Sequence, residues 1–566
     1  MCFGSIRYFY QTSKAAVLSS TDWIILIAVL SAIILYGVYK SRTTKNLDGY
    51  FLSNRSMPWY LVLLSIMGTQ ASAITYLTGP GQAYTDGMRF VQYYFGLPIA
   101  MIVISYFFVP VYNKLKVYTA YEFLENRFDL KTRSLTSFLF LISRGLSTGV
   151  SIYAPSLILS SLMGWNIYLT NVVMGGVLII YTMSGGARAV AYTQTLQMVI
   201  VFASLFMIAY IAVNMLPADV GFNGAIRQAK ELGKMNVITT GFTEKGFDWK
   251  DKYNIWSGII GGFFLALSYF GTDHSQVGRY LTAKNVKESQ RGLLMNGLVK
   301  VPMQFGILLI GVLIFSFYLH HKAPVFFDNG KKAEAEATAY GDSLKIVEAR
   351  YTAAFAAGDT AAANGSRAAY KSLVKKALPG DDANDANFIF LRFVKDNLPV
   401  GLIGLLFAVI FLSAWGSIAA ALNSLAACTV IDFHKKFWVR NETAYDDYKV
   451  SQWYTFAWGI FCIIIAMFAH NIGNSLIEAV NILGSLFYGV ILGIFLVAFW
   501  IKRIGAKAVF YAAVLSEAGV ILIYSADVIS FLWLNVIGAL LVIGISCIFQ
   551  LLLPGNNYKT GRSASA

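Results

Sequence analysis

The residues of this sequence that could bind a ligand lie inside long apolar stretches, where polar groups are rare. Arg144 follows the apolar run 135–142, and Lys300 lies in a second such stretch. An arginine in the middle of a membrane costs about 2.5–3.5 kcal/mol, so it should face the protein interior and a partner. A guanidinium in that place suits a carboxylate, which it can bind with two hydrogen bonds. The alternative for both residues is a position near a helix end, with the charge extended to the membrane surface.

Residues 65–87 form an apolar stretch that small residues and a proline interrupt. Gly68, Gly79, Pro80 and Gly81 disfavour a continuous helix, because glycine is flexible and proline lacks an N–H. Inside a membrane such an interruption persists only where it is buried in protein or lines a cavity. Its freed carbonyl groups suit a cation, and an interrupted membrane helix is a sequence signal of a transporter's binding site. The alternative is a kinked structural helix.

Two serines offer hydroxyl groups in another apolar stretch. Ser413 and Ser417 are four residues apart, which places them on one face of a helix. Small residues of this kind often serve only to let two helices approach closely. Opposite the freed carbonyls of the interrupted stretch, however, the hydroxyls would suit Na⁺, a hard cation that prefers oxygen.

The sequence lacks the short motifs of the common enzyme classes. It has no Gly-x-x-x-x-Gly-Lys phosphate loop, no nucleophile elbow, no His-Glu-x-x-His and no clustered cysteines. No expected cytoplasmic loop is long enough for the nucleotide-binding domain of an ATP-driven pump. We therefore predict a gradient-driven carrier or a channel rather than an enzyme.

The composition is that of an all-α polytopic membrane protein. Of 566 residues, 57% are hydrophobic and only 13% are charged, whereas soluble domains carry about 25% charged residues. About 20 apolar residues cross a bilayer as a helix. This rule predicts about thirteen transmembrane helices, at 22–40, 59–84, 88–111, 134–163, 166–184, 188–214, 254–272, 291–320, 399–431, 451–469, 474–500, 505–525 and 528–553.

Basic residues alternate between the expected loops, which indicates the orientation. They concentrate after the first, third, seventh, ninth and eleventh expected helices, and the short intervening loops carry almost none. Because positive charge marks cytoplasmic loops, we expect the N-terminus outside and the C-terminus in the cytoplasm, with the chain in the cell (inner) membrane. The basic residues are Lys40, Arg42, Lys45, Lys114, Lys116, Arg127, Lys131, Arg133, Arg279, Lys284, Lys287, Arg291, Lys435, Lys436, Arg440, Lys502, Arg503 and Lys507.

The expected helices divide into two groups of five. Because five is odd, the second group begins on the opposite side of the membrane, as in the inverted repeats of many secondary transporters. An outer insertion, 321–397, contains a tract rich in Ala, Lys and Glu that predicts one or two exposed helices, either a solvated decoration or a binding element. The expected units are 1–58 (an extra helix and a cytoplasmic loop), 59–214 (first repeat), 215–253 (outer loop), 254–500 (second repeat) and 501–566 (two helices and a tail).

Several longer motifs add a resemblance to a known family. From about Trp23 to Trp500, apart from 321–390, the chain resembles the sodium:solute symporter family, which includes sodium/glucose, iodide, multivitamin and sialic-acid transporters. That family implies the leucine-transporter fold, a five-plus-five inverted repeat, with one extra N-terminal helix and two at the C-terminus. The matching motifs are Tyr50–Trp59, Thr119–Phe128, Ser184–Ala189, Thr272–Asn285 and Leu398–Ala408.

The resemblance implies a sodium site at particular positions. Backbone carbonyls at Gly68, Ala71 and Ser413 would bind the ion, together with hydroxyls at 416 and 417. Here residue 416 is glycine, so only Ser417 keeps its hydroxyl. Members with a second sodium have an aspartate where this chain has Gln194, whose amide offers an oxygen without a charge. We therefore expect Na⁺ as the coupling ion, and one sodium rather than two.

The resemblance also implies the residues of the substrate pocket. They would be Gln70, Ser72 and Thr75 from the interrupted stretch, Tyr269 and Phe270 from the seventh helix, Asn481 from the eleventh, and Arg144. The Tyr-Phe pair resembles an aromatic gate of sugar-transporting members. Val150–Leu159 is similar to the iodide, monocarboxylate and vitamin branch, and sialic-acid members use an arginine in this helix.

The prediction from the sequence is a sodium-coupled symporter of a small organic anion that works by alternating access. A sodium/sugar symporter is the alternative within the same class, and a non-transporting solute sensor is the alternative from another class. The expected partners are the solute, sodium and the lipid bilayer, with no nucleic acid.

Overall fold

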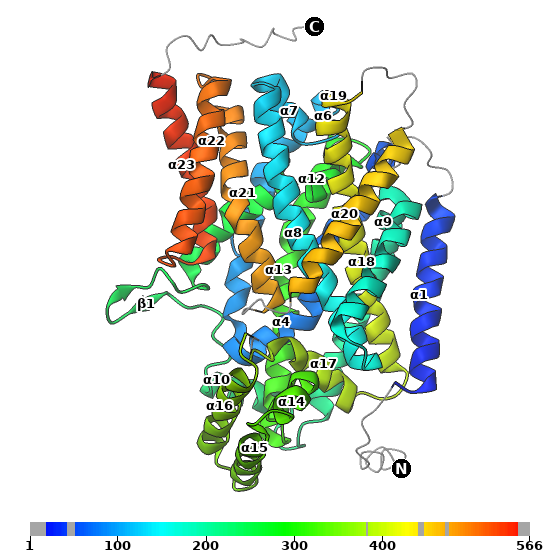
Figure 1. Cartoon of the computed structure of the whole chain (residues 1–566), viewed down its shortest axis with the longest axis vertical. Coiled ribbons are helices and arrows are strands. Elements are labelled where there is room, and N and C mark those ends of the chain that lie inside the picture. The colour runs from blue at the N-terminus through cyan, green and yellow to red at the C-terminus, as the bar shows by residue number, and fades with distance from the viewer. Residues whose placement is uncertain (1–17, 42–50, 381–382, 440–446, 470–474, 553–566) are drawn as a thin grey trace.

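The structure, a computed structural model, describes residues 18–41, 51–380, 383–439, 447–469 and 475–552. Its long helices run side by side between two ends of the molecule (Figure 1). One end, the C-terminal end, carries the last residues of α23 (Phe531–Leu552), together with α7 (Glu122–Arg127) and α19 (Lys435–Phe437). The other, the insertion end, carries α10 (Gly221–Glu231) and the helices of the insertion. The basic residues predicted at 42, 45 and 440 lie outside the described residues.

The chain is a multi-pass membrane protein. Ten stretches of the described residues are long and apolar enough to cross a membrane, and three shorter apolar stretches are Trp59–Gln70, Ile167–Met183 and Ser257–Gly271. The number of crossings expected from the sequence stays a prediction. The uninterrupted long helices lie close to their predicted ranges. They are α1 (Ser20–Ser41), α8 (Leu130–Met163), α13 (Val286–His320), α18 (Leu402–Cys428), α20 (Asp447–Phe468), α21 (Leu476–Trp500), α22 (Ala506–Ser525) and α23 (Phe531–Leu552).

The first predicted interruption exists, but it lies at different residues. Helix α3 (Trp59–Gln70) ends and α4 (Ala73–Asp86) begins on either side of Ala71 and Ser72. Ala71 has ψ 77° and Ser72 has ψ 176°, so neither is helical. The chain is therefore extended for two residues in the middle of an apolar segment.

The glycines predicted to break this helix serve packing instead. Gly79, Pro80 and Gly81 lie inside α4. A Cβ at Gly81 would lie 2.0 Å from the carbonyl oxygen of Ala386, in the helix α17 (Ala386–Asn397). Glycine at 81 thus permits the backbones of α4 and α17 to touch.

The second interrupted helix differs from the predicted segment 254–272. A π-helical turn, η5 (Ser257–Gly261), leads into α11 (Gly262–Gly271), which ends at a break, and α12 (His274–Leu281) continues beyond it. The prediction that Arg279 belongs to a basic loop is wrong. Arg279 lies in α12 and is only 2% exposed, because α12 packs against α3 and α18.

The third predicted helix, 88–111, folds as four short consecutive segments. A Cβ at Gly96 would lie 2.1 Å from the backbone nitrogen of Phe263, and one at Gly258 would lie 2.2 Å from the carbonyl of Gln92. These close approaches hold this region against η5 and α11. The four segments are η3 (Gly87–Tyr94), α5 (Leu97–Val103), η4 (Ile104–Phe108) and α6 (Val109–Leu115).

The predicted helices 166–184 and 188–214 both lie within one element, α9 (Ile167–Asn214). The hydroxyls of Tyr181 and Thr193 are 2.9 Å apart. In a straight helix, twelve residues would separate them by about 18 Å along the axis. The two spans of α9 are therefore not collinear, which agrees with two separate predicted helices.

The extra N-terminal helix holds the start of α18. The carboxylate of Asp22 accepts hydrogen bonds from the backbone N–H groups of Gly401 (2.6 Å) and Gly404 (3.0 Å). The first N–H groups of a helix have no partner within it, and a negative charge there is favourable. At the C-terminal end, a buried ion pair between Arg133 and Asp432 (2.5 Å) ties α8 to η6 (Thr429–His434), the continuation of α18.

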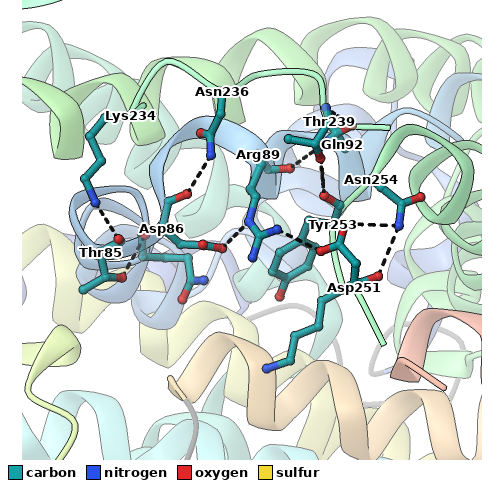
Figure 2. Close-up of polar contacts among 12 residues, drawn as sticks. Thr85, Asp86, Arg89, Gln92, Lys234, Asn236, Thr239, Asp251, Tyr253 and Asn254 are labelled. Carbon is teal, nitrogen blue, oxygen red and sulfur yellow. Dashed lines mark hydrogen bonds and ion pairs between the residues drawn. The ribbon is translucent and has the colours of Figure 1, made fainter. Parts of the chain in front are cut away.

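The outer loop after α9 lies over the end of α4 and η3. Lys234 Nζ donates to the carbonyl of Thr85 (2.6 Å), and the Gln92 amide donates to Thr239 and to the Tyr253 carbonyl. Arg89 forms an ion pair with Asp251 (2.8 Å), as Figure 2 shows. The loop also contains a short hairpin, β1 (Phe242–Thr243) and β2 (Gly246–Phe247). It thereby fastens η3 to the chain that leads into η5.

The insertion is more ordered than the sequence predicted. It forms four helices, of which α17 packs against α4 and the other three share a core of their own, which includes Leu344, Tyr351 and Tyr370. Arg367 donates to the hydroxyl of Tyr84 at the end of α4 (3.1 Å), so the insertion is attached to the interrupted helix. The three helices are α14 (Asn329–Glu336), α15 (Gly341–Ala356) and α16 (Thr360–Ala377).

The close contact at Gly81 gives a test of the packing between α4 and α17. The substitution Gly81→Ala should destabilise the protein by about 1–3 kcal/mol, because backbone atoms must move apart to admit the methyl group. The matched control is Gly176→Ala, where a Cβ would meet no atom within 4 Å. Thermal unfolding in detergent measures both. A Gly81→Ala protein as stable as the control would contradict the packing.

Asp328 gives a pH test in the insertion. Its side chain accepts hydrogen bonds from Gly330 and Lys331 at the start of α14, and burial raises its pKa from 3.8 to about 6. Because the folded pKa is the higher one, the stabilisation is present below about pH 4 and is lost as the pH rises through 6. In Asp328→Asn, the protection of α14 amides from hydrogen exchange, corrected for intrinsic rates, should lose this dependence. Asp359→Asn, at the exposed start of α16, should retain it.

Candidate functional site

A cavity of about 100 Å³, the central pocket, lies between the breaks of the two interrupted helices. All seven residues predicted for substrate binding line it, although they come from α3, α4, α8, α11 and α21. Their role in binding stays a prediction. The lining residues are Gln70, Ser72, Ile74, Thr75, Tyr93, Tyr94, Leu97, Arg144, Gly262, Leu265, Ala266, Tyr269, Phe270, Ile477, Val480, Asn481 and Tyr488.

Tyrosines form the wall of the pocket toward the insertion end. The Tyr93 hydroxyl donates to Asn481 Oδ1 (3.1 Å), which joins η3 to α21. The Tyr93 ring also stacks on Phe90 and meets Tyr94 edge-on. The buried amide nitrogen of Asn481 has no hydrogen-bond partner among the described residues, so it remains a free donor near the pocket.

A buried ion pair forms the opposite wall. Arg144 donates to Asp273 and to the Tyr488 hydroxyl (2.9 Å), and Tyr488 donates to Asp273 (2.9 Å). The guanidinium also lies 5.2 Å from the ring centre of Tyr269. The pairing decides one alternative left by the sequence: Arg144 faces the protein interior and a partner, not the membrane surface.

The sequence analysis missed two members of this wall. Asp273 lies in the motif Thr272–Asn285, but the region was predicted to be a loop. Tyr488 follows Asn481 by seven residues, two helical turns, so the spacing alone places both on one face of α21. Neither residue could be matched to Arg144 from the sequence, because the contact joins three separate helices.

Lys300 is a second buried cation near the pocket. Its side chain is fully buried, and its ammonium has no hydrogen-bond partner among the described residues. The ammonium lies 5.4 Å from the ring centre of Tyr94, a residue that lines the pocket. One turn further along α13, both amide atoms of Gln304 are also unpartnered. A buried charge in a membrane protein ordinarily pairs or faces a cavity.

The predicted sodium residues lie where α3, α9 and α18 meet. Gln194 Nε2 donates to the Gly416 carbonyl and to Thr69 (3.1 Å each), and its Oε1 accepts from Ser65 (2.9 Å). A Cβ at Gly68 would lie 2.9 Å from the Gln194 side chain. The Gln194 amide therefore bridges α3 and α18, with its donor nitrogen toward Gly416.

The serines of α18 lie beside this bridge. Ser413 and Ser417 are both buried, and the Ser417 hydroxyl donates to the Ala414 carbonyl (3.0 Å). Its oxygen keeps a lone pair for a cation. Sodium binding by Gly68, Ala71, Ser413, Ser417 and Gln194 stays a prediction.

Two membrane helices with breaks that face one polar pocket define a class of protein. This is the arrangement of a secondary transporter, in which interrupted helices form the binding site within the membrane.

Comparison with known proteins gives the family. Residues 50–516 match the model of the sodium:solute symporter family, and the chain belongs to this family. It is 25% identical over 541 residues to the sodium/sialic acid symporter NanT of Aliivibrio fischeri, covering 94% of this chain and 93% of that protein. It is 24% identical over 528 residues to the sodium/sialic acid symporter SiaT of Proteus mirabilis, covering 92% and 93%.

A solved structure with the same fold is that of a Na⁺-coupled sialic acid symporter in a substrate-bound outward-open state. The TM-score is 0.76 at 23% identity, and the match covers 95% of this chain and 99% of the other. The predicted leucine-transporter fold is thereby confirmed. The bounds predicted for its two repeats stay a prediction.

The bridge at Gln194 gives a test of the sodium site. In Gln194→Asp the donor to Gly416 is replaced by a full negative charge, so sodium should bind more tightly, by about tenfold for 1.4 kcal/mol. Binding of radioactive sodium to the purified protein measures the change. The control is Asn171→Asp, a similar change in the same element, where the amide contacts Ala466 instead. An unchanged affinity in Gln194→Asp would place the sodium site elsewhere.

Proposed function

We propose that this sodium-coupled symporter imports a small organic monoanion, of the sialic acid or monocarboxylate type, together with one sodium ion. The observation that carries the proposal is the charge around the central pocket. The charges of Arg144 and Asp273 cancel, and a protonated Lys300 beside the pocket would leave one positive charge among these buried residues. A monoanion would neutralise it, and charge left uncompensated in a low-dielectric interior is costly.

The donors near the pocket suit a carboxylate as well. Arg144 lines the pocket, and the buried amide nitrogen of Asn481 has no hydrogen-bond partner among the described residues. Hydrogen bonds from charged donors to a carboxylate are about twice as strong as neutral ones. The sialic acid symporters among the relatives agree with an acidic solute.

Sodium would bind at the junction of α3 and α18, through Gly68, Ala71, Ser413 and Ser417. There it would hold the broken helix against α18 and favour the state that receives the solute. A ligand shifts a conformational equilibrium only by its difference in affinity for the two states. The neutral amide of Gln194 supports one sodium rather than two.

The orientation proposed from the basic residues places the C-terminal end in the cytoplasm. Arg279 is buried in α12, so it is no longer one of the basic loop residues that indicate the orientation. The basic residues that follow α12 are accessible to solvent; they are Lys284, Lys287 and Arg291. The insertion would then face the outside.

A neutral sugar is the second candidate, and the aromatic lining of the pocket favours it. Tyr269 and Phe270 lie edge-on with ring centres 4.9 Å apart, and Tyr93 and Tyr94 face the same cavity. The two solutes differ in driving force. Sodium with a monoanion is electroneutral, whereas sodium with a sugar carries one charge, worth about 2.3 kcal/mol per 100 mV, or roughly fifty-fold accumulation.

Uptake into proteoliposomes distinguishes the candidates. We expect uptake of radioactive N-acetylneuraminate, pyruvate or lactate that requires sodium, ignores an imposed potential and is lost in Lys300→Met, a change that keeps the length of the side chain and removes the charge. The control is Lys345→Met, an exposed lysine of α15. Sodium-dependent uptake of glucose or galactose that rises with the potential would favour the sugar, and binding without uptake would favour a sensor.

A further inference from the structure

Asp273 joins three elements on the side of the central pocket that faces the C-terminal end. Its Oδ1 accepts hydrogen bonds from the backbone N–H (2.8 Å) and the hydroxyl (2.6 Å) of Ser275, at the start of α12. Its Oδ2 accepts from Tyr488 of α21 and from Arg144 of α8. The side chain is 1% exposed. One carboxylate therefore holds the start of α12 against both α8 and α21.

Arg144 belongs to this junction and to the pocket at the same time. Its Nε and Nη2 atoms bond to Asp273, and Nη2 also bonds to the Tyr488 hydroxyl. The ring of Tyr269 lies beside the guanidinium, and the Tyr269 hydroxyl accepts from Gln276 of α12 (2.7 Å). A solute in the pocket thus meets an edge of the same guanidinium that holds α12.

A solute carboxylate at that edge would compete with Asp273. Two carboxylates on one guanidinium repel each other, and the repulsion is strong where water is excluded. The solute gains its full two-bond contact with Arg144 only when Asp273 releases it. A neutral solute can accept a hydrogen bond from Arg144, but it does not repel Asp273.

We propose that Arg144, Asp273 and Tyr488 form a latch that keeps the C-terminal side of the pocket closed, and that the carboxylate of the solute weakens it. The negative charge of the solute then promotes opening of this side of the pocket, beyond any effect that an uncharged solute has when it binds. Asp273 acts through Arg144 and α12, as a positioning residue. The role of the solute carboxylate rests on the proposed function, whereas the closing role of the three residues does not.

A cysteine in α12 can report the opening. A Cβ at Gly278 would lie 3.6 Å from the His274 ring, an ordinary contact, so Gly278→Cys fits. The position is buried in this structure. In a background with Cys2→Ser and Cys547→Ser, the labelling rate of this cysteine by a hydrophilic maleimide in nanodiscs measures how often α12 moves away. Cys428 and Cys462 are buried and can stay.

Two variants test the latch without any solute. In Asp273→Asn we expect labelling about tenfold faster, within the range of ordinary coupling energies. Tyr488→Phe removes one hydroxyl and keeps the ion pair, so it should give a smaller increase and remains informative if Asp273→Asn does not fold. The control is Asp22→Asn, another buried carboxylate, which should leave labelling unchanged. Equal labelling in the two latch variants and the unsubstituted reporter overturns the latch.

The same labelling assay with added solutes tests whether the solute carboxylate weakens the latch. N-acetylneuraminate, pyruvate and lactate, each with sodium, should accelerate labelling of the reporter, and their uncharged methyl esters should not. In Asp273→Asn the difference between acid and ester should disappear. Equal effects of acid and ester, or no effect of any acid, overturn release by the carboxylate. Failure of the proposed function would instead appear as sugar uptake in the transport assay, while the solute-free comparison would still decide whether the latch exists.

Discussion

In a membrane every backbone N–H and C=O group needs a partner, because hydrocarbon supplies none. The non-helical residues Ala71–Ser72 and Thr272–Asp273 therefore have to lie in the interior of the helix bundle. α13 and α18 pack against α4, and α21 packs against α11, so the breaks are shielded from lipid. The central pocket is the consequence: two interrupted helices meet where their unpaired groups can be satisfied by side chains or a ligand.

Charged side chains inside the bundle also need partners, because burying a charge costs more free energy than burying a backbone group. Arg144 and Asp273 are buried as a pair, with Tyr488 and Ser275 completing the hydrogen bonds of the carboxylate. Removing one partner of a buried pair leaves an uncompensated charge, which costs about 3–5 kcal/mol. Lys300 has no such partner among the described residues. The contrast between a paired and an unpaired basic side chain is the basis on which we propose an acidic solute.

The parts outside the transporter core are attached to the helices that carry the site. Asp22 of α1 holds the start of α18, the helix with Ser413 and Ser417. Arg367 of the insertion contacts the end of α4, the second half of the broken helix. Both contacts place accessory elements at the ends of site helices.

The sequence by itself determined the class of protein and many of the helices. Apolar length, basic loops and family motifs do not depend on distant contacts, so they can be read along the chain. The interrupted helices could be predicted too, but not the residues at which they are interrupted. Gly81 lies inside α4, where its backbone contacts α17. The helix is interrupted instead at Ala71 and Ser72, which are neither glycine nor proline. Arg279 was misplaced for the same reason, since only packing shows that α12 continues beyond the break.

Only the tertiary structure decided which polar groups are partners. The pairing of Arg144 with Asp273 joins residues 129 positions apart, and Gln194 meets Gly416 across 222 positions. Sequence can show that an arginine in a membrane needs a partner, because the cost of burying a charge is a local property. It cannot show which carboxylate forms the ion pair, because that depends on how the helices pack.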